Sequence, residues 1–494
     1  MLDVAGRRLR GKLMDVRTIK TAGFVLGPAL AGIMLALGAP DGLSFAAWAT
    51  GALLAWMAVW WASEPVPIPA TSLLPLIVLP LIGAATARQA AVGYSSPIVL
   101  LLLGGFIIAL GIERWDLHKR IALNVVARSG NQPKALLAGF MIATALLSMW
   151  ISNTATTLMM VPIVLSVATS LEGEQDNRFT LALLLGVCYA ASIGGVATPV
   201  GTPTNLIALD ALAEINGAEI GFATWIKFGV PAMLLLVPAA WLAVGWNLPK
   251  GTTDSSAQDE ISRQLRGLGK MSTPEARIAL VFAIVAALWI SRAFVQDAAE
   301  AAGFAPGWLM GISDMGIAIF GSMLMFLIPA GANNKRALLN WEEAERLPWG
   351  VLILFGGGIS LGNAIRETGL SAWIGQQLEI LSILPPVFFV AAVVALVIFL
   401  TELTSNVATM TTLAPILAAL AVAIGADPAS LLAPAAVAAS CVFMLPVATA
   451  PNAIIYATGK IPVAEMMRAG LRINLAGILI ITAIGYWIAP AVLG

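Results

Sequence analysis

The chain has 494 residues, of which 59% are hydrophobic and only 11% are charged, and its mean hydropathy is +0.90. A soluble domain carries about 25% charged residues, so this composition excludes an ordinary soluble protein. The formal net charge is zero, which provides no basic surface for a nucleic-acid partner. We therefore expect an all-α polytopic membrane protein whose surroundings are the lipid bilayer.

The N-terminal segment, residues 1–20, is basic and precedes the first apolar stretch. No small-residue cleavage site follows it, so it is unlike a signal peptide. Positive charge favours the cytoplasmic side of a membrane, and we expect a cytoplasmic N-terminus on a multi-pass protein of the inner (plasma) membrane. The basic residues are Arg7, Arg8, Arg10, Lys12, Arg17 and Lys20.

Apolar stretches recur from there to the C-terminus, most of them near the length of about 20 residues that spans a bilayer. We expect helices, because an isolated strand cannot satisfy its backbone in lipid. The expected spans are 21–38, 45–62, 68–86, 97–113, 181–200, 223–246, 277–296, 312–330, 349–365, 430–448 and 470–492. The basic connections at 114–134, 250–277 and 335–346 fit the cytoplasmic side.

The segment 249–276 is a polar linker between two halves that resemble each other. Three landmarks recur in the same order, and the second copy lies 247 to 253 residues after the first. Internal duplication is typical of secondary transporters, whose binding sites lie where the repeats meet. The pairs are Gly104-Gly105 and Gly356-Gly357, Ser152-Asn153 and Ser405-Asn406, and the segments 202–205 and 449–452.

Each Ser-Asn motif divides an apolar stretch into two pieces that are slightly short for a bilayer span. Paired short segments in corresponding places indicate re-entrant hairpins or broken helices, whose tips would meet near the membrane midplane. The pieces are 135–151 and 155–169 in the first half, and 386–403 and 407–424 in the second.

The tips at 152–154 and 404–406 have a chemistry of their own. Ser, Asn and Thr are good N-caps, and the free N–H groups of the helix that they begin favour a carboxylate. The preceding half-helix ends in free carbonyls, which suit a hard cation such as sodium. An alternative for such polar residues is hydrogen bonding between membrane helices.

Prolines mark a second pair of interruptions, at residues 199–203 and 446–451. Proline removes a backbone donor and breaks a helix. Unwound backbone at membrane depth is tolerated only inside the protein or around a water-filled cavity, so we expect these breaks to face the tips.

Neither Lys nor Arg occurs at 135–177, 179–226 or 367–459, which include all the tips and breaks. A bound anion must therefore be balanced by helix ends, neutral donors and co-bound cations, and this predicts cation dependence. Glu402 could bias a cation site or pair with Thr or backbone donors, and we favour the pairing. The single histidine, His118, lies in a basic run, and nothing predicts a nucleophile with its base, so we expect no enzyme. The broken helices argue against a purely structural scaffold.

Four stretches resemble the divalent anion/sodium symporter (DASS) family, which transports di- and tricarboxylates or sulfate. The similarity covers nearly the whole chain. The stretches are WWASEPVPIPATSLLPLIVLPLIG at 60–83, LLLLGGFIIALGIERWDLHKRIAL at 100–123, LPWGVLILFGGGISL at 347–361 and ELTSNVATMTTLAPIL at 402–417.

This resemblance implies two inverted repeats with about eleven transmembrane helices and two re-entrant hairpins, in a homodimer. A transport domain would move past a scaffold domain like an elevator. The implied scaffold comprises 21–130 and 277–384, and the implied transport domain comprises 131–248 (hairpin 1 and a broken helix) and 385–494 (hairpin 2 and a broken helix).

The resemblance also implies site residues, several of them through backbone carbonyls. The first sodium site would be Ser148, Ser152, Asn153 and Gly201, and the second would be Thr401, Thr404, Asn406 and Ala448. The substrate carboxylates would contact Ser152, Asn153, Thr154, Thr202, Ser405, Asn406 and Thr449.

Two positions depart from the family. Val407 stands where many bacterial members have a second threonine, and Ala450 replaces a common proline. We expect sodium-coupled symport of a C4-dicarboxylate such as succinate, malate or fumarate, with the exact substrate preference open. A sodium-independent dicarboxylate exchanger and a sodium-coupled citrate or sulfate transporter are the alternatives.

Overall fold

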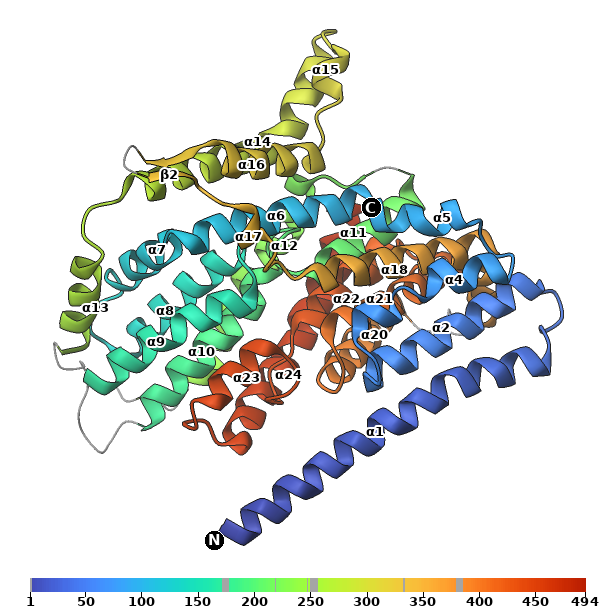
Figure 1. Cartoon of the computed structure of the whole chain (residues 1–494), viewed down its shortest axis with the longest axis horizontal. Coiled ribbons are helices and arrows are strands. Elements are labelled where there is room, and N and C mark those ends of the chain that lie inside the picture. Colours follow the sequence, from blue (N-terminus) through green and yellow to red (C-terminus); the bar gives the residue numbers. More distant parts are fainter. Residues whose placement is uncertain are drawn as a thin grey trace. The chain divides into compact units, whose positions relative to one another are not determined.

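Helices form most of the computed structural model, which describes residues 2–170, 177–217, 219–246, 248, 256–331, 334–378 and 385–494. The first part of the expected linker, 249–255, lies outside the described residues. The chain, whose helices are labelled in Figure 1, divides into two compact units. Unit 1 comprises Met1–Val99, Pro348–Ile383 and Val407–Ala426, and unit 2 comprises Leu100–Leu347, Leu384–Asn406 and Asp427–Gly494. The scaffold and transport domains expected from the sequence stay a prediction.

Unit 1 is built from short and long helices of both halves of the chain. Its elements are α1 (Leu2–Leu37), α2 (Phe45–Ser63), α3 (Ile68–Thr71), α4 (Leu74–Leu81), α5 (Ala87–Val92), the 3-10 helix η1 (Gly93–Ser95), α18 (Trp349–Glu367), α19 (Leu370–Leu378) and nearly all of α21 (Asn406–Ala423).

Unit 2 contains the rest, including a short antiparallel pair of strands. Its elements are most of α6 (Pro97–Arg114), α7 (Leu117–Val126), α8 (Pro133–Ser148), α9 (Asn153–Ser170), α10 (Asn177–Gly195), α11 (Pro203–Asn216), α12 (Phe222–Gly245), α13 (Ser256–Gly267), α14 (Thr273–Ala301), α15 (Gly307–Met310), α16 (Asp314–Leu327), β1 (Pro329–Gly331), β2 (Asn334–Ala337), α17 (Trp341–Ala344), α20 (Pro386–Thr401), α22 (Ala429–Ser440), α23 (Ala450–Ala457), α24 (Val463–Trp487) and α25 (Ala489–Leu493).

Nine helices in the described part of the chain are long and apolar enough to cross a membrane. Large apolar side chains on them are exposed, such as Leu234 on α12, Phe294 on α14 and Leu479 on α24, as expected for helices whose outer faces contact lipid. The expected spans at 68–86, 312–330 and 430–448 correspond to shorter apolar helices. The chain is therefore a multi-span membrane protein, as its composition predicts.

The helices on either side of the two Ser-Asn motifs have the same lengths in both halves of the chain. α8 and α20 both have 16 residues, and α9 and α21 both have 18. The two members of each pair start 253 residues apart, at Pro133 and Pro386 and at Asn153 and Asn406. The predicted breaks at the Ser-Asn motifs are confirmed, although α21, which has the 18 residues expected for this piece, is long and apolar enough to count among the nine possible spans in the described part of the chain. The inverted relation of the halves stays a prediction.

Small residues let the helices of unit 1 approach closely. A Cβ atom on Gly27 of α1 would lie 2.7 Å from the Trp60 ring of α2, and the neighbouring Phe24 stacks on that ring. Trp61 donates to the Ser72 hydroxyl at 3.0 Å, and Tyr94 donates to the Ser72 carbonyl at 2.5 Å. Close backbone packing is how membrane helices associate without a hydrophobic driving force.

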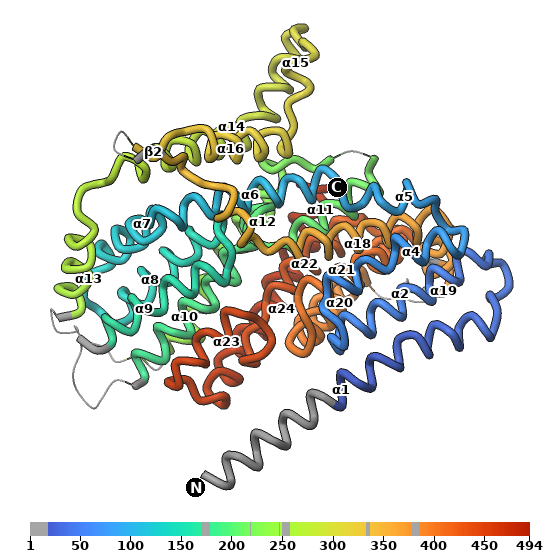
Figure 2. The backbone as a smooth tube through the Cα atoms, viewed as in Figure 1, coloured from blue at the N-terminus to red at the C-terminus, as the bar shows by residue number. Residues whose placement is uncertain are grey.

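In unit 2, α10 packs against both α8 and α9, and α14 runs beside α16 (Figure 2). The polar linker forms α13, whose Glu260 accepts a 2.6 Å hydrogen bond from Ser166 of α9. The hydrogen bonds from Ser166 and Gln264 hold the pKa of Glu260 below its usual range, despite partial desolvation of the carboxyl group. The described part of this linker therefore packs against the helix that follows the first tip.

We predict that Gly194→Ala destabilises the protein by about 1–3 kcal/mol, the usual cost of overpacking. A Cβ atom on this residue of α10 would lie 2.4 Å from the backbone oxygen of Ala145 in α8, which cannot rotate away. Thermal unfolding in detergent measures the effect. Gly362→Ala is the matched control, because no atom lies within 4 Å of its added Cβ and alanine favours a helix. Equal melting temperatures for both variants would contradict the close packing.

Candidate functional site

The first tip lies between the end of α8 at Ser148 and the start of α9 at Asn153. The Ser148 hydroxyl donates to the Asn153 side-chain oxygen at 2.8 Å. The Ser152 hydroxyl accepts from the Ala155 backbone N–H at 3.2 Å, which is the predicted N-cap. Ser152 is exposed, and Asn153 and Thr154 are half-buried, so a ligand can reach the N-terminus of α9.

The first break lies at residues 196–202, where the chain leaves α10 before entering α11. The Thr198 hydroxyl donates to the Met149 carbonyl of the first tip at 2.5 Å. The expectation that this break faces its tip is therefore confirmed. Thr202 is buried at the N-cap of α11, beside Pro203, which needs no N–H partner in the first turn.

Oxygen atoms converge around Gly195, the last residue of α10, and Gly201 of this break. A Cβ atom on Gly195 would lie 2.6 Å from the Asn153 Oδ1 and 3.1 Å from the Gly201 carbonyl oxygen. A Cβ atom on Gly201 would lie 2.9 Å from the Met149 carbonyl oxygen. The structure thus brings Ser148, Asn153 and Gly201 together, with the predicted Ser152 next in the chain. Neutral side-chain and carbonyl oxygens are the ligands that hard cations prefer.

The two breaks are held by asparagines with the same hydrogen bonds. Asn205 donates to the Gly195 carbonyl at 3.0 Å and to the Thr198 carbonyl at 2.7 Å. Asn452 donates to the carbonyls of Val442 and Leu445, at 3.1 and 2.9 Å. In both cases the acceptors lie ten and seven residues before the asparagine. The sequence shows this pair at the ends of the matched segments, but does not show that they fasten the breaks.

The second tip contacts the second break through Glu402. Its carboxylate accepts hydrogen bonds from the backbone N–H groups of Phe443, Met444 and Leu445, at 2.8 to 3.2 Å. The Asn474 amide donates to the same carboxylate at 2.9 Å. The expected pairing of Glu402 with backbone donors is confirmed, and this break also faces its tip.

The residues predicted for the second sodium site, and the substrate residues predicted beside them, bond carbonyl and N–H groups of the protein. Thr401 donates to the Ala439 carbonyl at 3.2 Å, and Thr404 donates to the Leu400 carbonyl at 3.0 Å. Thr449 caps α23 by accepting from the Asn452 N–H at 3.4 Å. Ser405 and Asn406 are half-buried at the start of α21, and Ala448 ends the break. Their assembly into a cation site stays a prediction.

Side chains of the first half hold the second break directly. Tyr189 of α10 donates to the Phe443 carbonyl at 2.8 Å, and the Cys188 thiol donates to the Asn452 Oδ1 at 3.0 Å. The Thr204 hydroxyl lies 2.8 Å from the Ser440 hydroxyl. The two breaks are therefore neighbours. Sequence reasoning missed Cys188 and Tyr189, because nothing in an apolar run indicates which residue faces the other half.

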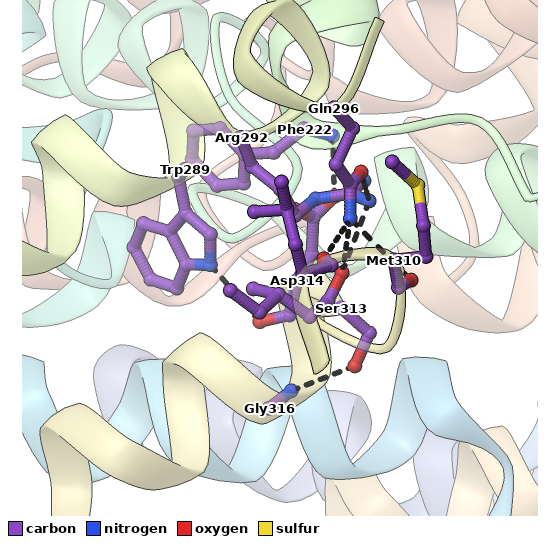
Figure 3. A network of polar contacts seen from close by, with 10 residues as sticks. Phe222, Trp289, Arg292, Gln296, Met310, Ser313, Asp314 and Gly316 are labelled. Atoms are coloured by element: carbon purple, nitrogen blue, oxygen red, sulfur yellow. Dashed lines mark hydrogen bonds and ion pairs between the residues drawn. The ribbon is translucent and has the colours of Figure 1, made fainter. Parts of the chain in front are cut away.

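An aromatic stack supports the first tip. The Trp150 ring stacks on Phe222 and on Trp289, with ring centroids 6.0 and 6.5 Å away. Figure 3 shows the polar network beside this stack, in which Asp314 accepts from the Phe222 N–H at 2.6 Å and pairs with Arg292 at 2.7 Å. The network fixes the first residue of α12 to α14 and α16, and so fixes the stack that holds the tip.

We predict that Asp314→Asn destabilises the protein by about 1–3 kcal/mol, because it weakens the acceptor for Arg292 and for the Phe222 N–H in a partly buried site. The Arg292 and Asp314 side chains are only 19% and 12% exposed. Asp116→Asn is the control, since the Lys119–Asp116 pair is 44% and 52% exposed and such pairs contribute about 0–1 kcal/mol. Thermal unfolding in detergent distinguishes the two, and a small loss for Asp314→Asn would show that the network does not hold the tip.

The fold and the site define a polytopic membrane protein of the transporter class, with an oxygen-lined helix break at its first tip. The profile described as "Sodium:sulfate symporter transmembrane region" matches residues 19–493, and the chain belongs to this family. The resemblance read from the sequence is confirmed. Since the family consists of transporters, the chain is a transporter and not an enzyme.

The relatives that match over most of the chain carry a more specific description. "Sodium-dependent dicarboxylate transporter SdcS" of Staphylococcus saprophyticus is 41% identical over 485 residues, which are 96% of this chain and 92% of the relative. SdcS of Staphylococcus aureus strain MRSA252 is 40% identical over 489 residues, with the same coverage.

Two solved structures share the fold at low sequence identity. The YdaH transporter of Alcanivorax borkumensis has a TM-score of 0.57 and 15% identity, over 90% of this chain and 99% of that one. MtrF of Neisseria gonorrhoeae has a TM-score of 0.59 and 15% identity, over 91% of this chain and 96% of that one. These similarities concern the fold alone.

Proposed function

We propose that this chain is a secondary active transporter that couples the entry of a C4-dicarboxylate, such as succinate, malate or fumarate, to the entry of sodium. The observation that carries the proposal is the first tip, where a capped helix N-terminus adjoins converging neutral oxygens. A helix N-terminus favours a carboxylate, and neutral oxygens favour a hard cation. The relatives described as sodium-dependent dicarboxylate transporters support the same assignment.

The proposed roles follow the two tips. One sodium ion binds at Ser148, Ser152, Asn153 and Gly201, and a second binds at Thr401, Thr404, Asn406 and Ala448. The substrate carboxylates bind at Ser152, Asn153, Thr154, Thr202, Ser405, Asn406 and Thr449. Because the surrounding segments carry neither Lys nor Arg, the two cations supply the positive charge that a dianion requires.

The movement proposed for this site is an elevator motion. In this proposal the transport domain (131–248 and 385–494) moves past the scaffold domain (21–130 and 277–384) in each subunit of a homodimer. The N-terminus lies in the cytoplasm, as the basic residues of the first 20 positions favour.

Uptake by the purified protein in liposomes tests the coupling. We predict that uptake of labelled succinate collapses when potassium replaces sodium outside, because the dianion then lacks its balancing cations. Counterflow of succinate against internal succinate in sodium-free buffer measures the alternative. Rapid sodium-free counterflow would identify a dicarboxylate exchanger. Strong competition by citrate or sulfate would instead indicate a sodium-coupled citrate or sulfate transporter.

Alanine variants of the two tip asparagines test the site. A hydrogen bond to a charged group contributes about 1.5–3 kcal/mol, so Asn153→Ala and Asn406→Ala should each lower uptake tenfold or more. The dimer should remain intact in size-exclusion chromatography. Asn124→Ala is the control, since the Asn124 side chain donates to the Arg120 carbonyl within α7, away from both tips. A tip variant with normal uptake would remove that asparagine from the site.

A further inference from the structure

Glu402 is a buried acid, and the residue is only 4% exposed. Its hydrogen-bond partners are three successive backbone N–H groups, of Phe443, Met444 and Leu445, and the Asn474 amide. Successive N–H groups that point to one place form a concave anion site. In this protein the anion is the Glu402 carboxylate, which belongs to the second tip.

In the second break, side chains form hydrogen bonds both to backbone N–H groups and to backbone carbonyl groups. Glu402 accepts from the N–H groups of residues 443–445, and Asn452 donates to the carbonyls of Val442 and Leu445. Tyr189 donates to the carbonyl of Phe443 between them. The backbone of 442–445 is therefore fixed by side chains rather than by helical hydrogen bonds, and its orientation depends on them.

The first break has no such acid. The position 253 residues before Glu402 is Met149, and in the first break the N–H groups of Val196 and Ala197 bond the carbonyls of Ile193 and Gly194. Local turns thus satisfy the first break, whereas the second break requires a carboxylate. The two breaks are alike in their asparagines and unlike in how their N–H groups are satisfied.

The held segment leads directly to a proposed sodium ligand. The N–H of Ala448 bonds the Leu445 carbonyl at 3.3 Å, so the position of Leu445 sets that of Ala448. Glu402 itself lies next to Thr401 and two residues before Thr404, at the tip that carries the other proposed ligands. One carboxylate therefore fixes the tip and the break of the second site relative to each other.

We propose that Glu402 is a positioning residue for the second sodium site. It does not bind the cation, because its oxygens are occupied by N–H donors. It holds 443–445 so that the Ala448 carbonyl is aligned with the tip, and its negative charge favours a cation there. This inference rests on the proposed function. It makes the two sodium sites different, because a carboxylate positions the second site and local turns position the first.

The test is the sodium dependence of succinate uptake by Glu402→Gln in liposomes. Glutamine keeps the shape of the side chain but removes the charge and one of the two acceptor oxygens. A hydrogen bond contributes about 0.5–1.5 kcal/mol, so the sodium concentration for half-maximal uptake should rise roughly twofold to tenfold. At saturating sodium, the succinate KM and the maximal rate should return to within about twofold of wild type.

Glu260→Gln is the matched control, because Glu260 is also a hydrogen-bonded acid of low exposure but lies on α13. Its sodium dependence should equal that of wild type. Asn474→Leu provides a second variant if Glu402→Gln does not fold. It removes one donor to Glu402 and should raise the half-maximal sodium concentration in the same direction but less.

The outcomes separate the two proposals. If wild-type uptake does not depend on sodium, the proposed function is wrong. If wild type depends on sodium but the variants at 402 and 474 keep its half-maximal concentration, Glu402 has no positioning role. A uniform loss of maximal rate that saturating sodium does not restore also overturns the inference, because it indicates only a structural contribution.

Discussion

Backbone polar groups that leave a helix inside the membrane must find partners within the protein, because lipid offers none. The two breaks depend on this constraint. Asn205 and Asn452 each bond the carbonyls ten and seven residues earlier, and this repeated arrangement keeps both unwound segments in one conformation. The tips and the converging oxygens have defined positions only because the breaks do.

The duplication is close in architecture but unequal in chemistry. The helices before and after the two tips have equal lengths, and their starts repeat at one spacing. At the second tip, however, Glu402 replaces Met149, and Val407 replaces the threonine at 154. The two tips therefore differ by a carboxylate and by a hydroxyl.

Much of this structure follows from residue patterns. The spans follow from hydrophobic length, and the interruptions follow from polar motifs and prolines, since these are local properties of the chain. The first tip agrees with its predicted N-cap at Ser152, and Ser148, Asn153 and Gly201 lie together. Cys188, Tyr189 and Asn474 could not be found in this way, because their partners lie 72 to 264 residues away along the chain.

The sequence by itself determined the class of the protein, the positions of the helices and the duplicated tips. These depend on hydrophobicity, helix propensity and capping, which act over a few residues. Tertiary structure alone decided that Glu402 binds the second break, that Tyr189 reaches across the halves, and that Trp150 rests on the stack beside Arg292 and Asp314. These contacts depend on which faces of distant helices meet, and packing of the whole chain fixes those faces.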